Sequence, residues 1–186
     1  TFLNILVGIL FPSSGSIQFS QTPPLIGSSI SQKGFFPYLT LKKNLKIYSL
    51  LCKAPTKQLE YYITYFELFP VITKKFKRLS EGERQKASLI TAFIGSPNLI
   101  ILDEPTNNLD YNSQSKLLKL IQDKKEEGVT FIITSHILSD IEKVADKISF
   151  MKEGQVVSSY SVDYYIKNYH TIEKAYEQLL GGFDKN

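Results

Sequence analysis

The run Leu99–Leu102 consists of four aliphatic residues and ends abruptly in Asp103, Glu104 and Pro105. A short apolar run of this kind predicts a strand that is buried on both faces, as in a parallel sheet. The two acids then lie at the carboxyl end of the strand, where open α/β sheets bind their ligands. Adjacent carboxylates there are costly unless a cation is held, such as a magnesium ion that carries phosphates. Asp103 would hold that metal and Glu104 would orient or deprotonate a water, whereas the simpler alternative is a strand ended by an acidic turn.

A second buried strand is predicted for residues 129–134, after an amphipathic helix over residues 112–127 that Gly128 ends. A strand–helix–strand crossover makes the two strands parallel, so Ser135 and His136 reach the same edge as Asp103 and Glu104. His136 would then donate a hydrogen bond to a terminal phosphate or position the water of Glu104. A histidine after a strand is more often structural, and only its convergence with two acids favours the functional interpretation.

A helix start is indicated at Ser80, because Glu83 follows it by three residues and completes a capping box. The helix runs to about Ile94, and residues 95–97 stop it. Unpaired amides at a helix start suit a phosphate group, and Gly82 has no side chain to obstruct its approach. An ordinary capped helix is the commoner alternative.

The other segments predict a mixture of helices and strands. The tail of a helix opens the chain, weak strands are expected over residues 16–20 and 25–31, and a glutamine, Gln32, follows the second of these. Gln32 is either a ligand of metal and water through its amide oxygen or a plain surface residue. Further helices are expected over residues 41–51, 57–68 and 139–146, then a hairpin of residues 147–151 and 155–159, and a helical tail. The expected core between the two sheet-like parts includes Phe66, Leu68, Phe69 and Phe76.

Length and charge set broad limits on this chain. Its 186 residues suit one domain, residues 1–186, and its formal charge of +4 is too mild to indicate a nucleic-acid partner. A single cysteine, Cys52, excludes an internal disulfide and fits a reducing compartment. No apolar run approaches the length of a membrane span, so any membrane role requires a partner.

Taken in order, these motifs resemble those of the nucleotide-binding domain of ABC transporters. Gln32 is similar to the Q-loop glutamine, Leu79–Glu83 to the LSGGQ signature, Leu99–Glu104 to the Walker B strand with its catalytic glutamate, Asn107–Asp110 to the D-loop, and His136 to the switch histidine. The order and spacing of several motifs are far more specific than any one of them. The resemblance implies an α/β fold of the P-loop NTPase type, a mainly parallel sheet flanked by helices, with an inserted all-helical subdomain over roughly residues 41–94.

The same resemblance implies an ATPase that uses ATP and Mg²⁺. Glu104 and His136 would be catalytic, Asp103 and Gln32 would contact the metal, and Gln32, Ser80, Gly82, Asp103 and Asp110 would contact the nucleotide. Two such domains pair head to tail around two ATP molecules and drive a transmembrane permease. The protein would then be cytoplasmic, on the inner face of the cell membrane, and its composition resembles that of bacterial exporters of peptides or drugs.

Two departures from the family pattern bear on this interpretation. The phosphate loop (Walker A) is absent, since the chain contains no Gly-Lys pair, and the start at Thr1 suggests an N-terminally truncated sequence. We therefore expect little ATP affinity, and no activity, from the polypeptide alone. The signature carries Glu81 and Glu83 in place of Gly and Gln, and we expect both acids to point away from the nucleotide.

Two alternatives to a transporter motor remain at this level. A soluble ABC-type translation factor shares the D-loop sequence but carries two such domains in one chain. A relic that does not hydrolyse ATP would act only as a scaffold for a partner.

Overall fold

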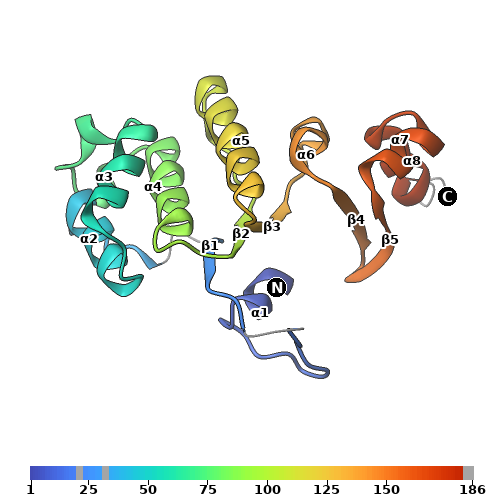
Figure 1. Cartoon of the computed structure of the whole chain (residues 1–186), viewed down its shortest axis with the longest axis horizontal. Helices are drawn as coiled ribbons and strands as arrows, with labels where there is room; N and C mark the ends of the chain where they lie inside the picture. The colour runs from blue at the N-terminus through green and yellow to red at the C-terminus, as the bar shows by residue number, and fades with distance from the viewer. Residues whose placement is uncertain (20–22, 31–33, 182–186) are drawn as a thin grey trace. The chain divides into compact units, whose positions relative to one another are not determined.

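The computed structural model describes residues 1–19, 23–30 and 34–181. The chain forms two compact units, Thr1–Ser135 and His136–Asn186 (Figure 1). The expectation of a single domain over residues 1–186 stays a prediction.

The first unit is built on a parallel sheet of three strands in the order β1-β2-β3. These strands are β1 (Ile26–Ser29), β2 (Leu99–Asp103) and β3 (Thr130–Thr134). The middle strand is β2, and its residues Ile100, Ile101 and Leu102 are at most 1% exposed. The aliphatic run therefore forms the buried strand that the sequence predicts, because it is covered on both faces.

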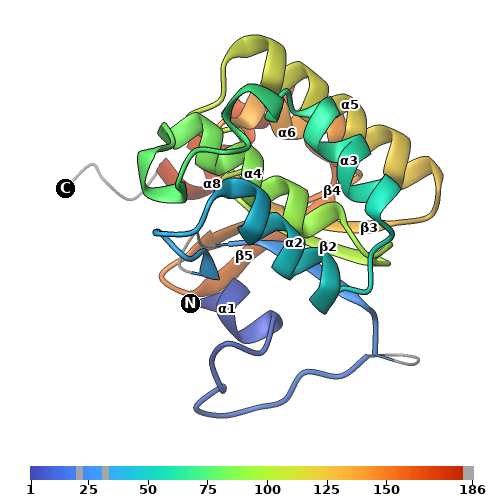
Figure 2. The same cartoon turned by 90° about the vertical axis from the view of Figure 1, so that its left-hand side faces the viewer.

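The helices of the first unit are α1 (Phe2–Leu6), α2 (Leu41–Leu51), α3 (Thr56–Tyr65), α4 (Glu81–Phe93) and α5 (Tyr111–Glu126), with short 3-10 helices at Phe69–Val71 and Phe76–Arg78. Helices α2, α3 and α4 pack against one another and form the all-helical block that the sequence predicts between β1 and β2 (Figure 2). Its limits as a subdomain over residues 41–94 stay a prediction. Helix α5 connects β2 to β3 and packs against β3.

Helix α4 lies very close to strand β1. A Cβ atom added to Gly27 would be 1.9 Å from the carbonyl oxygen of Ala92, so only glycine permits this approach. The hydroxyl groups of Ser29 and Ser88 are joined by a hydrogen bond of 2.7 Å between the same two elements. These contacts hold the C-terminal half of α4 against strand β1.

Four expectations for the first unit are wrong. Strand β3 is not buried, since Thr130 is exposed and its other four residues are only half-buried. Residues 16–19 form no strand, and Ile17 and Phe19 are 40% and 42% exposed, because no neighbouring strand in the described residues pairs with them. Helix α3 ends at Tyr65 rather than at Leu68. Phe69 is 53% exposed, whereas the other three expected core residues, Phe66, Leu68 and Phe76, are buried.

The second unit consists of α6 (Leu138–Val144), β4 (Lys147–Lys152), β5 (Gln155–Ser161), α7 (Val162–Tyr169) and α8 (Ile172–Leu180). Strands β4 and β5 form the predicted antiparallel hairpin, whose turn residues Glu153 and Gly154 both have positive φ angles. The expected helical tail packs on this hairpin around a small core of its own, formed by Ile148, Phe150, Val162, Tyr165, Ile172 and Ala175.

Within the described ranges, none of the helices combines the length and the apolar character that crossing a bilayer requires.

Candidate functional site at the carboxyl end of the parallel sheet

Strands β2 and β3 end side by side, as the crossover rule predicts. Asp103 is in register with Thr134, and the Thr134 hydroxyl donates a hydrogen bond of 2.5 Å to Oδ1 of Asp103. Sequence reasoning missed Thr134, although its position at the end of the predicted strand could have identified it. The strand tips therefore present a carboxylate and a hydroxyl group together.

The residue after Asp103 leaves the line of the strand. Glu104 has a φ angle of +47°, in the left-handed region that non-glycine residues seldom adopt. Its amide donates to the carbonyl of Thr134 over 3.0 Å, and its own carbonyl accepts from the amide of Asn107 over 3.2 Å. A conformation of this kind costs on the order of 1–3 kcal/mol and is concentrated at functional sites. The backbone of Glu104 is thus held in an unfavourable turn by the adjoining strand.

The loop after Glu104 ends at Asp110, which caps helix α5. Its carboxylate accepts hydrogen bonds from the amide and the hydroxyl of Ser113 at 2.9 and 2.7 Å, and Nζ of Lys86 lies 3.4 Å away. The bonds from Ser113, followed by the charge of Lys86, lower the pKa of Asp110 to about 2. Asp110 is therefore an ionised helix cap, and its contact with a nucleotide stays a prediction.

Helix α4 begins with the capping box that the sequence predicts. The Ser80 hydroxyl accepts from the amide of Glu83 over 3.2 Å, and a Glu83 carboxylate oxygen accepts from the amide of Ser80 over 2.7 Å. Glu81 instead pairs with Arg84, whose guanidinium also donates to the carbonyl of Lys77 over 2.9 Å. Both acids of the signature segment thus have partners within the chain.

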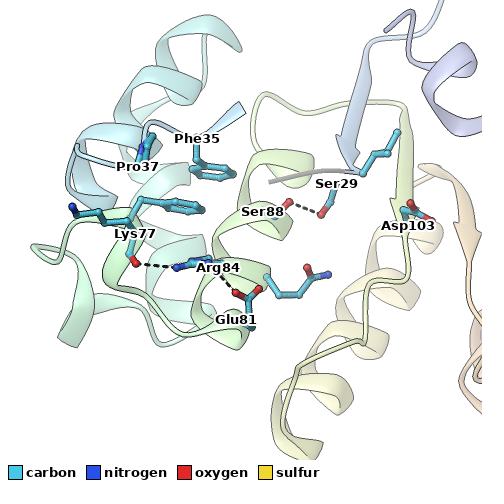
Figure 3. A pocket seen from close by; sticks show the side chains of 11 residues that line it. Ser29, Phe35, Pro37, Lys77, Glu81, Arg84, Ser88 and Asp103 are labelled. Carbon is cyan, nitrogen blue, oxygen red and sulfur yellow. Dashed lines mark hydrogen bonds and ion pairs between the residues drawn. The ribbon is translucent and has the colours of Figure 1, made fainter. Parts of the chain in front are cut away.

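A cavity of about 590 Å³ joins the start of α4 to the strand tips (Figure 3). Side chains of opposite charge line it, and among them are Lys77, Glu81, Arg84 and Asp103. Asp103 lines it from the sheet, whereas Arg84 and Glu81 line it from α4 (Figure 3). The cavity is therefore wide and polar enough to admit a charged ligand beside Asp103.

A second physical reason explains why a glycine stands at position 82. A Cβ atom added to Gly82 would be 2.7 Å from the carbonyl oxygen of Asn108, in the loop between β2 and α5. Gly82 thus permits close packing inside the chain, whether or not a phosphate also approaches it.

The positions of two predicted site residues relative to this group are not tested. Gln32 lies outside the described residues. His136 is the first residue of the second unit, and its convergence with Asp103 and Glu104 stays a prediction.

Within the part of the chain that the structure describes, no three His, Cys, Asp or Glu side chains form a metal-binding group. The oxygen atoms of Asp103 and Thr134 nevertheless have the chemistry that Mg²⁺ prefers, since it needs only one or two carboxylates beside water and phosphate.

This chain is similar in sequence to several known proteins. A family model described as "ABC transporter" matches residues 1–107. The lantibiotic transport ATP-binding protein SrtF of Streptococcus pyogenes is 32% identical over 163 residues, which cover 84% of this chain and 71% of that protein. The bacitracin transport ATP-binding protein BcrA of Bacillus licheniformis is 30% identical over 175 residues, which cover 88% of this chain and only 57% of that protein.

A solved structure described as the ATP-binding subunit of an ABC transporter has a similar fold. Its TM-score is 0.85 at 20% sequence identity, and the match covers 96% of this chain and 81% of that one. This likeness confirms the expected fold class, an α/β fold of the P-loop NTPase type.

Proposed function

The chain belongs to the ABC transporter family as one of its ATP-binding subunits, and from this premise we propose that it couples ATP hydrolysis to the export of a peptide through a membrane permease. The observation that carries the proposal is the strand tip at which Asp103 is in register with Thr134 and Glu104 follows in a left-handed turn. The likeness to this family implies that the subunit binds ATP and Mg²⁺. It also implies that the subunit pairs head to tail with a second nucleotide-binding domain.

Each side chain of the site has a distinct task in this proposal. Asp103 would hold Mg²⁺, which when bound neutralises phosphate charge. Glu104 would accept a proton from the attacking water at its carboxylate, and His136 would orient that water or donate to the terminal phosphate. The nucleotide of the paired domain would face Ser80, Gly82 and the amides in the first turn of α4. Asp110 would also contact a nucleotide. Gln32 would contact the metal through its amide oxygen.

A peptide cargo is supported by the names of the relatives. SrtF is named for lantibiotic transport and BcrA for bacitracin transport. These relatives favour a transporter over a soluble translation factor. The subunit would lie on the inner face of the cell membrane because its permease is embedded there.

The hydrolysis step is tested by the substitution Glu104→Gln in the complete gene product, assembled with its permease. A general base contributes about a hundred- to ten-thousand-fold in rate, so turnover should fall by at least about a hundredfold while ATP stays bound. The matched control is Glu126→Gln, which removes one carboxylate charge at the exposed far end of α5 and should leave turnover unchanged.

The two outcomes separate the candidate functions. Unchanged turnover in Glu104→Gln would overturn the assignment of the general base, and lack of any turnover in the unaltered complex would favour the non-hydrolysing scaffold.

Peptide export is tested separately with inside-out vesicles that contain the complex. A fluorescently labelled peptide antibiotic should accumulate in these vesicles only when ATP is present. ATP hydrolysis without peptide accumulation would overturn the class of cargo and leave the ATPase assignment intact.

A further inference from the structure

The loop between β2 and α5, residues 104–110, is held by the side-chain amides of two helices. Nε2 of Gln85 on α4 donates to the carbonyl of Pro105 over 3.1 Å. Nε2 of Gln114 on α5 donates to the carbonyls of Thr106 and Leu109 over 3.3 and 3.2 Å. Two glutamines thus satisfy three backbone carbonyls of one loop.

Gln85 acts from a face of α4 that lies against this loop. Gly82, Gln85 and Lys86 are spaced three and four residues apart and therefore share one side of the helix. The Cα of Gly82 approaches the carbonyl of Asn108 so closely that no side chain fits, and Lys86 pairs with Asp110. Gln85 itself is only 9% exposed, so water has little access to the hydrogen bond between its amide and the carbonyl of Pro105.

The loop needs such support because its backbone is unfavourable. Glu104 and Asn108 have φ angles of +47° and +62°, and the angle at Glu104 is the costly one, because asparagine adopts this region more readily. The loop's own backbone hydrogen bonds run from Asn107 to Glu104 and from Leu109 to Thr106, over 3.2 and 3.3 Å. Strained turns persist only where the surrounding structure fixes them, and here the glutamine amides supply that constraint.

We propose that Gln85 and Gln114 are positioning residues for Glu104, holding the turn that aims its carboxylate at the attacking water. This inference rests on the proposed function, in which Glu104 is the general base. Because Gln85 follows the signature segment on α4, it also links the start of that helix to the loop that carries Glu104. Any displacement of α4 on nucleotide binding would therefore reach Glu104 through this amide.

The test replaces each glutamine by methionine, which keeps the length of the side chain and removes its donor. Gln85→Met and Gln114→Met, in the complete protein with its permease, should lower kcat about tenfold to a hundredfold. Small misplacements of a catalytic group have effects of this size. The KM for ATP should stay within about twofold, because neither amide is proposed to touch the nucleotide.

The matched control is Gln58→Met on α3. Gln58 also makes an amide-to-backbone contact, since its Oε1 accepts from the amide of Gly95 over 3.0 Å, but it lies away from the strand tips. This variant should lose about as much stability as the other two and keep the unaltered kcat.

A double-variant experiment separates positioning from a merely structural role. If Gln85 acts through Glu104, Gln85→Met should cause no further loss of the residual single-turnover rate in a Glu104→Gln background. A second loss as large as the first would overturn the inference while the ATPase assignment stands. Unchanged turnover in Glu104→Gln alone would instead overturn the proposed function, and the inference with it.

Hydrogen exchange gives a measurement that does not depend on turnover. The amides of Asn107 and Leu109 should exchange faster in Gln85→Met and Gln114→Met than in Gln58→Met. Equal exchange at these amides in all three variants would overturn the inference even where a variant lost activity through poor folding.

Discussion

Replacing Gly82 by alanine adds one methyl group where α4 meets the carbonyl oxygen of Asn108. The new Cβ atom would be 2.7 Å from that oxygen, which is closer than such atoms approach in proteins. The oxygen belongs to the backbone of a loop that Gln85, Gln114 and Lys86 also hold, so it cannot yield as a flexible side chain would.

Two effects of opposite sign determine the stability of this variant. Alanine is a better helix former than glycine by up to about 1 kcal/mol, which would stabilise α4. Overpacking against a fixed neighbour costs about 1–3 kcal/mol. We expect the second effect to prevail, with a net loss of about 1–2 kcal/mol in the free energy of unfolding.

The sign of the change distinguishes two reasons for a glycine at position 82. If it serves only to admit a phosphate, the Gly82→Ala chain should be as stable as the unaltered chain, or more stable, when no nucleotide is present. If the contact with Asn108 matters, the variant should be less stable in the same buffer.

The assay is urea unfolding followed by circular dichroism, without nucleotide. At about 2 kcal/mol per molar urea, a loss of about 1–2 kcal/mol lowers the transition midpoint by about 0.5–1 M. The control is Gly181→Ala, because a Cβ atom there meets nothing within 4 Å and the φ angle is −83°. A midpoint that is unchanged or raised in Gly82→Ala would refute the packing argument.

Two further predictions concern the caps of α4 and α5. Ser80→Ala removes one half of the capping box and should cost about 1 kcal/mol of stability, measured as a lower urea midpoint, and an unchanged midpoint would contradict the importance of this cap. Asp110, whose pKa in the folded chain is about 2, stabilises the fold above the ordinary pKa of an aspartate and loses this contribution as the pH falls towards 2. The difference in melting temperature between the unaltered chain and Asp110→Asn should therefore shrink between about pH 4 and about pH 2, and a difference that is constant across this range would contradict the argument.

Local chemistry was sufficient to predict the parts of the site that lie in or beside one element. The aliphatic run before Asp103 predicted a buried strand because four apolar side chains in a row can only be covered on both faces. Ser80 and Glu83 predicted the helix start because a capping box is completed within a single turn. The parallel pairing of β2 with β3 followed from the helical crossover that joins them, because a helix of this length returns the chain to the edge where the first strand began.

The contacts that hold the site could not be predicted in the same way. Nothing in the sequence distinguishes Gln85 or Gln114 from any other glutamine on a helix, and their roles depend on which carbonyls the fold brings near them. The alternation over residues 16–20 indicated a strand, but residues 16–19 form none, because a strand forms only where a neighbour offers a free edge.

The sequence by itself determined most of the elements and their order, and that Asp103 and Glu104 would lie at the end of a buried strand. Those features arise from interactions within a few residues or from the connectivity of the chain. The tertiary structure alone decided that Thr134 donates to Asp103, that Glu104 adopts a left-handed turn, and that α4 lies against the loop through Gly82. These features depend on distances between segments far apart in the chain, and such distances are set only when the helices and the sheet pack together.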